Sequence, residues 1–415
     1  MRNMGTDSPA YAEANKKWSA TCRMIFGRDV GEVSDYAEWL SEIRRKNVEG
    51  ISSVSKKAVF FSVPHYSKDA RKIALDEVDF EKRFPPLSIN EIKDIDSIIC
   101  AVSDRIAYAG DVVLGNSNFV EKGSNIVDSN YIYDCDQIGY SKHVAYCNEC
   151  SYSERMFGCQ GFGYASFSIL CAAYYKSTRC LWAHRTDGSS DCYYVHGLCA
   201  CKDCMFCFNL RGKRFAIGNL VLPKGKYMEI KGKLVSEMAD ELERKKRLPH
   251  LFDIASASKP DLREIRRMAS ELAPHETQKI DKCAVEKAFS DTAGIVLGKR
   301  FSGIDRYADW LRKYTRRTEL AVSCASGKPL VVSDYNIFMQ IPSDRLLGID
   351  EADSLCGKIC MSEKDAPGIS LRGAAGIIPK IAYFSADWPV GKVVNAIESP
   401  IAIDSSHCYK NILAV

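Results

Sequence analysis

Residues 132–159 read IYDCDQIGYSKHVAYCNECSYSERMFGC and contain a repeat of twelve residues. Cys135, Cys147, Cys159 and Cys171 are spaced twelve apart, and the same register reaches Cys207. Three further columns, offset by steps of three residues, hold mostly small or apolar side chains. They run Ile132, Val144, Met156, Ser168, Cys180, Cys192, Cys204 and Ala216; Ser117, Ser129, Ser141, Ser153, Ala165, Ser177, Ser189 and Cys201; and Ile138, Cys150, Phe162, Tyr174, Thr186, Leu198 and Leu210. The positions between them carry the charges, so every third residue is expected to face a narrow interior.

A period of this kind is typical of a solenoid. A helix–loop–helix unit needs more than twelve residues, whereas a β-solenoid adds one coil per repeat and pairs neighbouring coils about 4.8 Å apart. The expected fold is therefore mixed α and β. It is a narrow right-handed parallel β-solenoid of about eight 12-residue coils, flanked by two related α+β capping modules. Such a coil is too slim to enclose a ligand.

The composition excludes several classes of protein. The chain has 415 residues, of which 46% are hydrophobic and 27% charged, and its formal net charge is +4. These values argue against a disordered tail protein, a collagen-like fibre and a highly basic nucleic-acid coat. The first eight residues hold no apolar core of a signal peptide, and no run of about 18 apolar residues could span a bilayer. We therefore expect a cytoplasmic protein whose 18 cysteines stay reduced.

Overlapping C-x-x-C motifs at residues 201–207 would, read alone, indicate a zinc ribbon. In a coil whose inward positions are three apart, two adjacent cysteines give this spacing without a metal, because a buried Cys packs as a small hydrophobe. Packing is the favoured interpretation, and disulfides are the least favoured. Zinc stays an open alternative, since four thiolates within nine residues could close a tetrahedral site. Its ligands would be Cys199, Cys201, Cys204 and Cys207.

Two pairs of polar residues share a register on neighbouring coils: His184 with His196, and Asp191 with Asp203. Stacked imidazoles can hold a metal, and paired carboxylates can act in acid–base catalysis. The simpler interpretation is that all four occupy exposed coil positions. In that case His184 and His196 could contact a partner.

The flanks of the repeat are themselves duplicated. Residues 26–40 (FGRDVGEVSDYAEWL) match residues 297–311 (LGKRFSGIDRYADWL) without a gap, 271 residues later. In each copy an amphipathic helix precedes an apolar strand, at 58–63 or 329–332, and these elements are expected to cap the N-terminal opening of the solenoid. Trp39 and Trp310 are expected to anchor the core, with an exposed partner contact as the alternative.

The predicted organisation has four parts. Residues 1–112 form the N-terminal α+β capping module, and residues 113–220 form the Cys/Ser-rich solenoid. Residues 221–290 form a basic helix and a helical linker, which includes a helix from Lys259 to Leu272. Residues 291–415 form a truncated second copy of the module that ends in one solenoid-like rung, which could stack on an open coil of the same or a neighbouring chain.

The basic stretch follows the last coil. Apolar residues recur at helical spacing from Tyr227 to Leu242, and Pro249 ends the pattern. The cations expected on the other face are Lys226, Lys231, Lys233, Arg244, Lys245, Lys246 and Arg247. A solvated helix face is the default explanation. RNA contact is the alternative, because clustered Lys and Arg release counterions from nucleic acid.

The end of the repeat array, CKDCMFCFNLRGKRF at residues 201–215, resembles that of uncharacterised cysteine-rich parallel β-helix proteins from environmental microbial genomes. In that group a C-x-x-C-x-x-C run leads into an L-R-N-K segment and then a basic helix, and residues 26–29 are similar to the part before their array. Gly212 stands here in place of the asparagine, and their Cys-rich, zinc-like N-terminal module has no counterpart. The resemblance implies the repeat fold and no activity.

Motifs of known catalysis are missing from the sequence, which has no G-x-G-x-x-G, Walker loop, H-E-x-x-H or G-x-S-x-G. We therefore favour a non-enzymatic interaction or scaffold protein on a rigid solenoid, which binds a protein partner or self-associates, with no membrane and no identifiable small-molecule substrate. One alternative is an RNA- or ribosome-associated protein that uses residues 224–247. Another is zinc or redox-metal binding by the clustered cysteines, with no other cofactor indicated. Polysaccharide cleavage ranks last, because only analogy to wider β-helices supports it.

Overall fold

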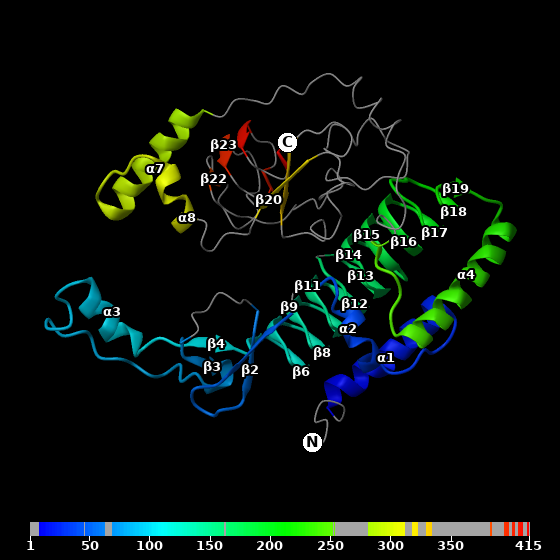
Figure 1. The fold of residues 1–415 in the computed structure, drawn as a ribbon. Coiled ribbons are helices and arrows are strands. Elements are labelled where there is room, and N and C mark those ends of the chain that lie inside the picture. Colours follow the sequence, from blue (N-terminus) through cyan, green and yellow to red (C-terminus); the bar gives the residue numbers. More distant parts are fainter. Residues whose placement is uncertain are drawn as a thin grey trace.

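The computed structural model describes residues 8–44, 46–62, 69–161, 163–251, 253 and 281–311, together with the backbone of short strands between residues 318 and 414. Figure 1 shows a row of strands with α1 and α4 running along one side of it. The N-terminal part contains α1 (Pro9–Phe26), η1 (Val33–Tyr36), α2 (Ala37–Leu40), β1 (Val48–Ile51), β2 (Ala58–Phe61), β3 (Lys72–Ala74), η2 (Leu75–Glu77), α3 (Ile95–Ser103) and β4 (Tyr108–Gly110).

The sequence of α1 defines both of its ends. The side chain of Ser8 accepts a hydrogen bond from the N–H of Tyr11 at 3.1 Å, and Pro9 occupies the first helical position, where no N–H is needed. Gly27 ends the helix with a φ of 77°, a left-handed conformation that glycine adopts without steric cost. This cap directs the chain back towards the solenoid through η1 and α2.

Strands β5 to β19 form the solenoid (Figure 1). Its longer sheet contains β6 (Asn118–Glu121), β8 (Asn130–Tyr133), β10 (Lys142–Ala145), β12 (Ser153–Phe157), β13 (Ala165–Ile169), β14 (Ala172–Tyr175), β15 (Leu181–Asp187), β16 (Ser190–Cys199), β17 (Lys202–Met205), β18 (Arg214–Ile217) and the antiparallel β19 (Leu220–Val221). Its shorter sheet contains β5 (Val113–Leu114), β7 (Ser124–Val127), β9 (Asp136–Gly139) and β11 (Asn148–Ser151). Partners such as Ile132 and Val144 are twelve residues apart and parallel. The predicted parallel β-solenoid is confirmed, and the described residues from β6 to β18 form about nine coils.

Each coil turns at residues with a positive φ, which recur at every third position. The corners of one coil are Tyr131, Asp134, Gln137 and Tyr140, with φ of 58°, 48°, 54° and 51°. This conformation costs an L-residue roughly 1–2 kcal/mol. The corner N–H gains a partner in the preceding coil in return, since Tyr146 donates to the carbonyl of Tyr133 at 3.1 Å. Four such corners give each coil four short sides.

Serine and cysteine fill the interior because they complete hydrogen bonds between coils. The N–H of Cys159 donates to Sγ of Cys147 at 3.1 Å, and Sγ of Cys159 donates to the carbonyl of Phe157 at 3.4 Å. The serine column repeats the arrangement, since the N–H of Ser141 donates to Oγ of Ser129 at 3.0 Å. A short side chain that both accepts and donates satisfies backbone groups that an aliphatic side chain could not.

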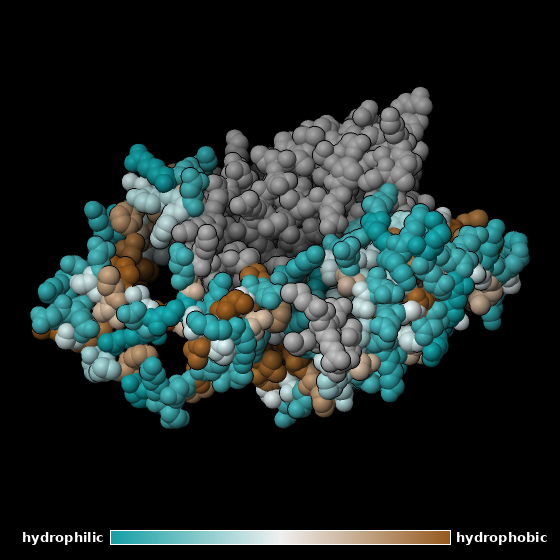
Figure 2. Space-filling model, turned by 60° about the horizontal axis from the view of Figure 1, so that its bottom comes forward, coloured by the Kyte–Doolittle hydropathy of each residue, from teal (hydrophilic) through white to brown (hydrophobic). Residues whose placement is uncertain are grey.

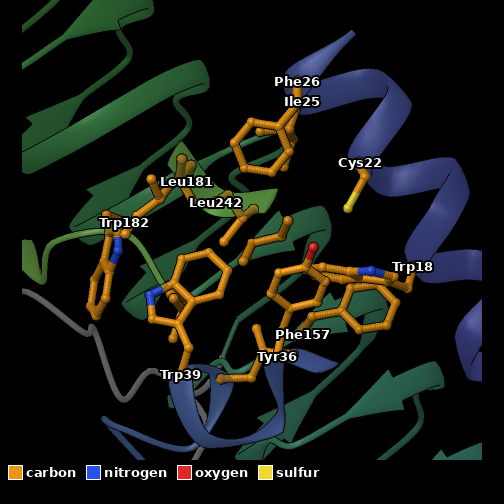
Figure 3. Packing of buried hydrophobic residues seen from close by; sticks show 14 of the residues in the cluster. Trp18, Cys22, Ile25, Phe26, Tyr36, Trp39, Phe157, Leu181, Trp182 and Leu242 are labelled. Carbon is orange, nitrogen blue, oxygen red and sulfur yellow. The ribbon is translucent and has the colours of Figure 1, made fainter. Parts of the chain in front are cut away.

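A second apolar core lies outside the coils, along one side of the solenoid. Each coil from β8 to β18 contributes one outward side chain to a set that we call the lateral ladder. It consists of Tyr133, Ala145, Phe157, Ile169, Leu181, Tyr193, Met205 and Ile217. Helices α1, α2 and α4 (Lys224–Lys245) cover this ladder (Figure 3). The ring centroids of Trp18 and Phe157 are 5.2 Å apart, and Oη of Tyr193 donates to the carbonyl of Ile25 at 2.8 Å.

The N-terminal part therefore covers both the side and the end of the solenoid. The helix expected to cap the N-terminal opening is α2, and its Trp39 and Leu40 instead pack in the cluster of the lateral ladder. Helix α1 likewise lies along the side, because it contacts β6, β8, β10, β12 and β13 in succession. The strands that follow do adjoin the first coils. Oδ1 of Asp111 accepts from the N–H of Phe60 at 2.8 Å, and Nδ2 of Asn47 donates to the carbonyl of Lys122 at 2.7 Å.

The second copy repeats the helical part with α7 (Lys282–Leu297), η3 (Ile304–Tyr307) and α8 (Ala308–Leu311). Its strands are β20 (Thr318–Val322), β21 (Pro329–Ser333), β22 (Ala382–Tyr383), β23 (Val394–Ile397), β24 (Ile401–Ala402), β25 (Ser406–Tyr409) and β26 (Leu413–Ala414). The expected single rung corresponds to β25. The structure shows more than one rung here, because β23 pairs with β25 and β24 pairs with β26, each at a twelve-residue register. The predicted helix from Lys259 to Leu272 lies outside the described residues. In the described parts of the chain, no helix has both the length and the apolar character to cross a membrane.

Candidate interaction surfaces and buried polar groups

The thiols proposed as zinc ligands do not converge on one point. Cys201, Cys204 and Cys207 are buried at successive inward positions of one coil, whereas Cys199 is partly exposed. Sγ of Cys204 donates to the carbonyl of Lys202 at 3.5 Å, so the backbone already uses this thiol. Among the described residues, no group of three or more His, Cys, Asp or Glu side chains is arranged to hold a metal ion. Zinc binding at this position stays a prediction without geometric support.

The other interior cysteines lie in an apolar surrounding. The fourteen cysteines whose side chains the structure describes are free thiols. Burial raises the pKa of Cys147 and of Cys171 well above the usual value, so both stay protonated at neutral pH. A protonated, inaccessible thiol is a poor nucleophile and a poor metal ligand. The thiol columns therefore serve the packing and hydrogen bonding of the coils.

The two histidines on neighbouring coils are buried, which corrects the expectation that they are exposed. His184 and His196 are 1% and 0% exposed, and their Nδ1 atoms are 2.7 Å apart. Nε of Arg185 donates to Nε2 of His184 at 3.4 Å, so the proton of His184 lies on Nδ1 and is donated to His196. Burial, reinforced by the neighbouring imidazole, holds the pKa of His184 well below its usual value. The two rings are hydrogen-bonded to each other inside the protein, so in this structure neither is exposed to a separate partner protein.

The paired carboxylates are each bound to a cation. Asp191 accepts two hydrogen bonds from Arg179, at 2.6 and 2.8 Å, and Asp203 accepts one from Lys231 at 3.0 Å. Although burial acts to raise it, the Arg179 guanidinium holds the pKa of Asp191 below its ordinary range. The geometry therefore does not support acid–base catalysis by this pair.

The basic helix is α4, and all seven cations named as RNA contacts lie within ion-pair distance of a carboxylate. Lys226, Lys233, Arg244 and Lys245 pair with acidic residues of α4 itself, and Lys231 pairs with Asp203. Lys246 and Arg247 pair with Asp35 and Glu42, which tie the end of α4 to the segment around α2. This pairing favours a structural role for the helix face, because phosphate groups would have to displace carboxylates.

The two tryptophans of the duplication differ in their surroundings. Trp39 is 2% exposed and packs between α1, α4 and the solenoid (Figure 3). Trp310 is 67% exposed, so the expectation of a core anchor holds for Trp39 and is wrong for Trp310. Three residues at the end of α7 are exposed as well. We call these exposed residues and Trp310 the α7–α8 apolar face: Ile295, Val296, Leu297 and Trp310.

Other apolar side chains are exposed elsewhere. Ile89, Ile95 and Ile99 lie on or near α3, and Figure 2 shows apolar residues among hydrophilic ones on the end of the molecule that carries α3 and β1–β4. Along the solenoid, the rings of Tyr140 and Tyr152 stack at a centroid distance of 4.9 Å with their edges exposed. Nothing in the described residues indicates what would cover either of these two surfaces.

The lateral ladder was not among the features predicted from the sequence. Its signal was present, because the residues from Tyr133 to Ile217 at intervals of twelve are all apolar. They occupy outward positions, where a narrow coil is expected to carry charge. An outward column that is apolar at every step indicates a covering element, and α1 and α4 supply it.

Comparisons with known proteins add no identification. No protein-family model, no curated protein and no solved structure matches this chain. The resemblance to cysteine-rich repeat proteins therefore stays a prediction.

Proposed function

We propose that this chain is a non-enzymatic interaction or scaffold protein, which binds a protein partner or self-associates through the α7–α8 apolar face. The single observation that carries the proposal is the difference in exposure between equivalent residues. Val296, Leu297 and Trp310 are 72%, 59% and 67% exposed. Their counterparts in the first copy are almost fully buried.

The composition of the face supports binding rather than solvation. Three successive aliphatic residues, Ile295, Val296 and Leu297, are exposed in the same helical unit as Trp310. Tryptophan is enriched at the centres of protein interfaces, where a few large side chains supply most of the affinity. Exposed apolar residues that stand singly need no explanation, but a contiguous group marks an interaction site. The solenoid supports a scaffold role because its coils are hydrogen-bonded to one another along their whole length.

The same proposal places the protein in a reducing compartment, such as the cytoplasm. Free, buried thiols in hydrogen-bonded columns suit such a compartment, and oxidation would disrupt the coils.

The test compares the wild-type chain with a double variant, Leu297→Lys with Trp310→Lys. The matched control is Leu220→Lys with Val221→Lys, which places the same charges on the exposed strand β19. For the wild type and the control, either light scattering should give a mass above the monomer or affinity capture from the native cells should return one stoichiometric protein partner. The double variant should give neither result. A wild-type chain that is monomeric and captures the same proteins as the double variant would contradict the proposal.

A further inference from the structure

The helical parts of the two copies are the same structural unit. Oδ1 of Asn15 accepts from the N–H of Val33 at 2.8 Å, and at the equivalent positions, 271 residues later, Oε1 of Glu286 accepts from the N–H of Ile304 at 2.7 Å.

The aromatic cores of the two units match too. The rings of Trp18 and Tyr36 have centroids 5.3 Å apart at an interplanar angle of 40°, and those of Phe289 and Tyr307 have centroids 5.3 Å apart at 42°. Gly27 and Gly298, with φ of 77° and 69°, end the long helices in the same left-handed conformation. The second unit therefore presents its outer side chains in the same geometry as the first.

In the first copy these outer side chains cover the lateral ladder. Ile25, Phe26 and Trp39 are 1%, 3% and 2% exposed, and they pack in one cluster with Leu181 and Trp182 of the solenoid (Figure 3). The equivalents of the three are Val296, Leu297 and Trp310, which belong to the α7–α8 apolar face. The interior of the second unit is complete without a ladder, because Val285, Phe289 and Ile304 bury one another.

The ladder in this chain is already occupied by α1, α2 and α4. The strands β24 and β26 pair at a twelve-residue register, as β6 and β8 do at the start of the solenoid. In the first copy, however, Ile25 bonds to Tyr193, which lies five coils beyond the Tyr133 of β8. The strands β24 and β26 therefore correspond to earlier coils than the one that Ile25 contacts in the first copy.

We propose that the α7–α8 apolar face is a docking surface for the lateral ladder of a partner's parallel β-solenoid with 12-residue coils. The inference rests on the proposed function and names the class of partner. The recognised surface is a flat row of aliphatic and aromatic side chains about 4.8 Å apart, one from each coil. Lys299 is the equivalent of Arg28, which pairs with Asp240 and Glu243 of α4. Because the second copy keeps a cation at this position, the partner should carry carboxylates beside its ladder.

The experiment uses the solenoid of this chain as the probe. In a full-length chimera, residues 281–311 replace residues 10–40, which the ungapped match allows without a change in length. The matched control is the same chimera with Lys at the positions that derive from Val296, Leu297 and Trp310. Hydrogen exchange of β12 to β17 and binding of an apolar dye report whether the ladder is covered.

We expect the chimera to protect the amides of β12 to β17 from hydrogen exchange nearly as well as the wild type does. The control should lose this protection by at least tenfold and should bind the dye. Equal loss of protection in both chimeras, including failure of both to fold, would overturn it. The result is independent of the capture experiment above, since the chimera needs no external partner. A covered ladder without any captured protein would refute the proposed function and leave the fit of the face to a solenoid intact.

Discussion

Trp39 and Trp310 occupy equivalent positions in two copies of one helical unit, yet Trp39 is buried against the solenoid and Trp310 lies on the surface. The internal geometry of the unit is the same around both. The difference therefore arises from what each unit packs against. A unit that folds around its own small core can keep a second apolar face for a separate partner.

The two tryptophans should respond differently to truncation. We predict that Trp39→Ala lowers the free energy of unfolding by about 3–5 kcal/mol, because it opens a cavity beneath α1 and α4. Trp310→Ala should change it by less than about 0.5 kcal/mol, because an exposed side chain loses little packing. Urea denaturation followed by far-UV circular dichroism gives both values. Equal effects of the two substitutions would contradict the difference in burial between Trp39 and Trp310.

The inward thiols should be replaceable by serine more readily than by alanine. Cys159→Ala leaves the N–H of Cys171, which now donates to the thiol at 3.3 Å, without a partner inside the coil. We predict a loss of about 2–3 kcal/mol from the unsatisfied donor and the lost volume. Cys159→Ser keeps the acceptor, so its loss should be smaller by about 1 kcal/mol or more. Thermal unfolding of the two variants measures the difference, and an alanine variant as stable as the serine variant would contradict the hydrogen-bonding role.

The buried histidines should make stability depend on pH. Burial lowers the pKa of His250 to about 4, and burial together with His196 lowers the pKa of His184. The unfolded chain takes up these protons near pH 6.5, whereas the folded chain does not, so stability is complete above pH 6.5 and falls as the pH drops towards 4. A drop of about 2.5 pKa units at His250 alone corresponds to about 3 kcal/mol.

Denaturation in urea between pH 7.5 and pH 4.5 tests this dependence. Glu77 affects stability in a separate pH range. A hydrogen bond from the hydroxyl of Ser52, together with other hydrogen bonds, lowers the pKa of Glu77 to about 2, so its contribution to the free energy of unfolding is lost only below about pH 4.5. The variant His250→Gln should flatten the slope between pH 6.5 and pH 4.5. A slope of the opposite sign, or one unchanged in this variant, would exclude neutral buried imidazoles as its origin.

Charge reversal at the end of α4 separates a structural role from RNA binding. Lys245→Glu, Lys246→Glu and Arg247→Glu together place carboxylates beside Glu241, Asp35 and Glu42. We predict that urea denaturation gives a lower free energy of unfolding, by on the order of 1 kcal/mol for each contact that joins α4 to the first helical unit. The control reverses Lys226 and Lys233, whose ion pairs lie within α4 and should matter less. If the triple variant keeps its stability and loses RNA retention, the RNA alternative takes precedence.

The sequence alone determined the solenoid and its interior. A twelve-residue register of small and apolar residues allows one backbone arrangement, because only coils stacked one strand apart bring Cys147 beside Cys159 and Ser129 beside Ser141. The duplication of residues 26–40 was equally visible, since it rests on identity of residues rather than on contacts.

Only the tertiary structure decided which of these residues are exposed. The sequence pattern places His184 and His196 at outward coil positions, whereas the structure buries both rings. Trp39 and Trp310 are the same residue in the same local sequence, so no local pattern could assign one to a core and the other to the surface. Whether a side chain is buried depends on what packs against it as well as on its own character. Trp39 packs against a solenoid whose lateral ladder begins about a hundred residues further along the chain.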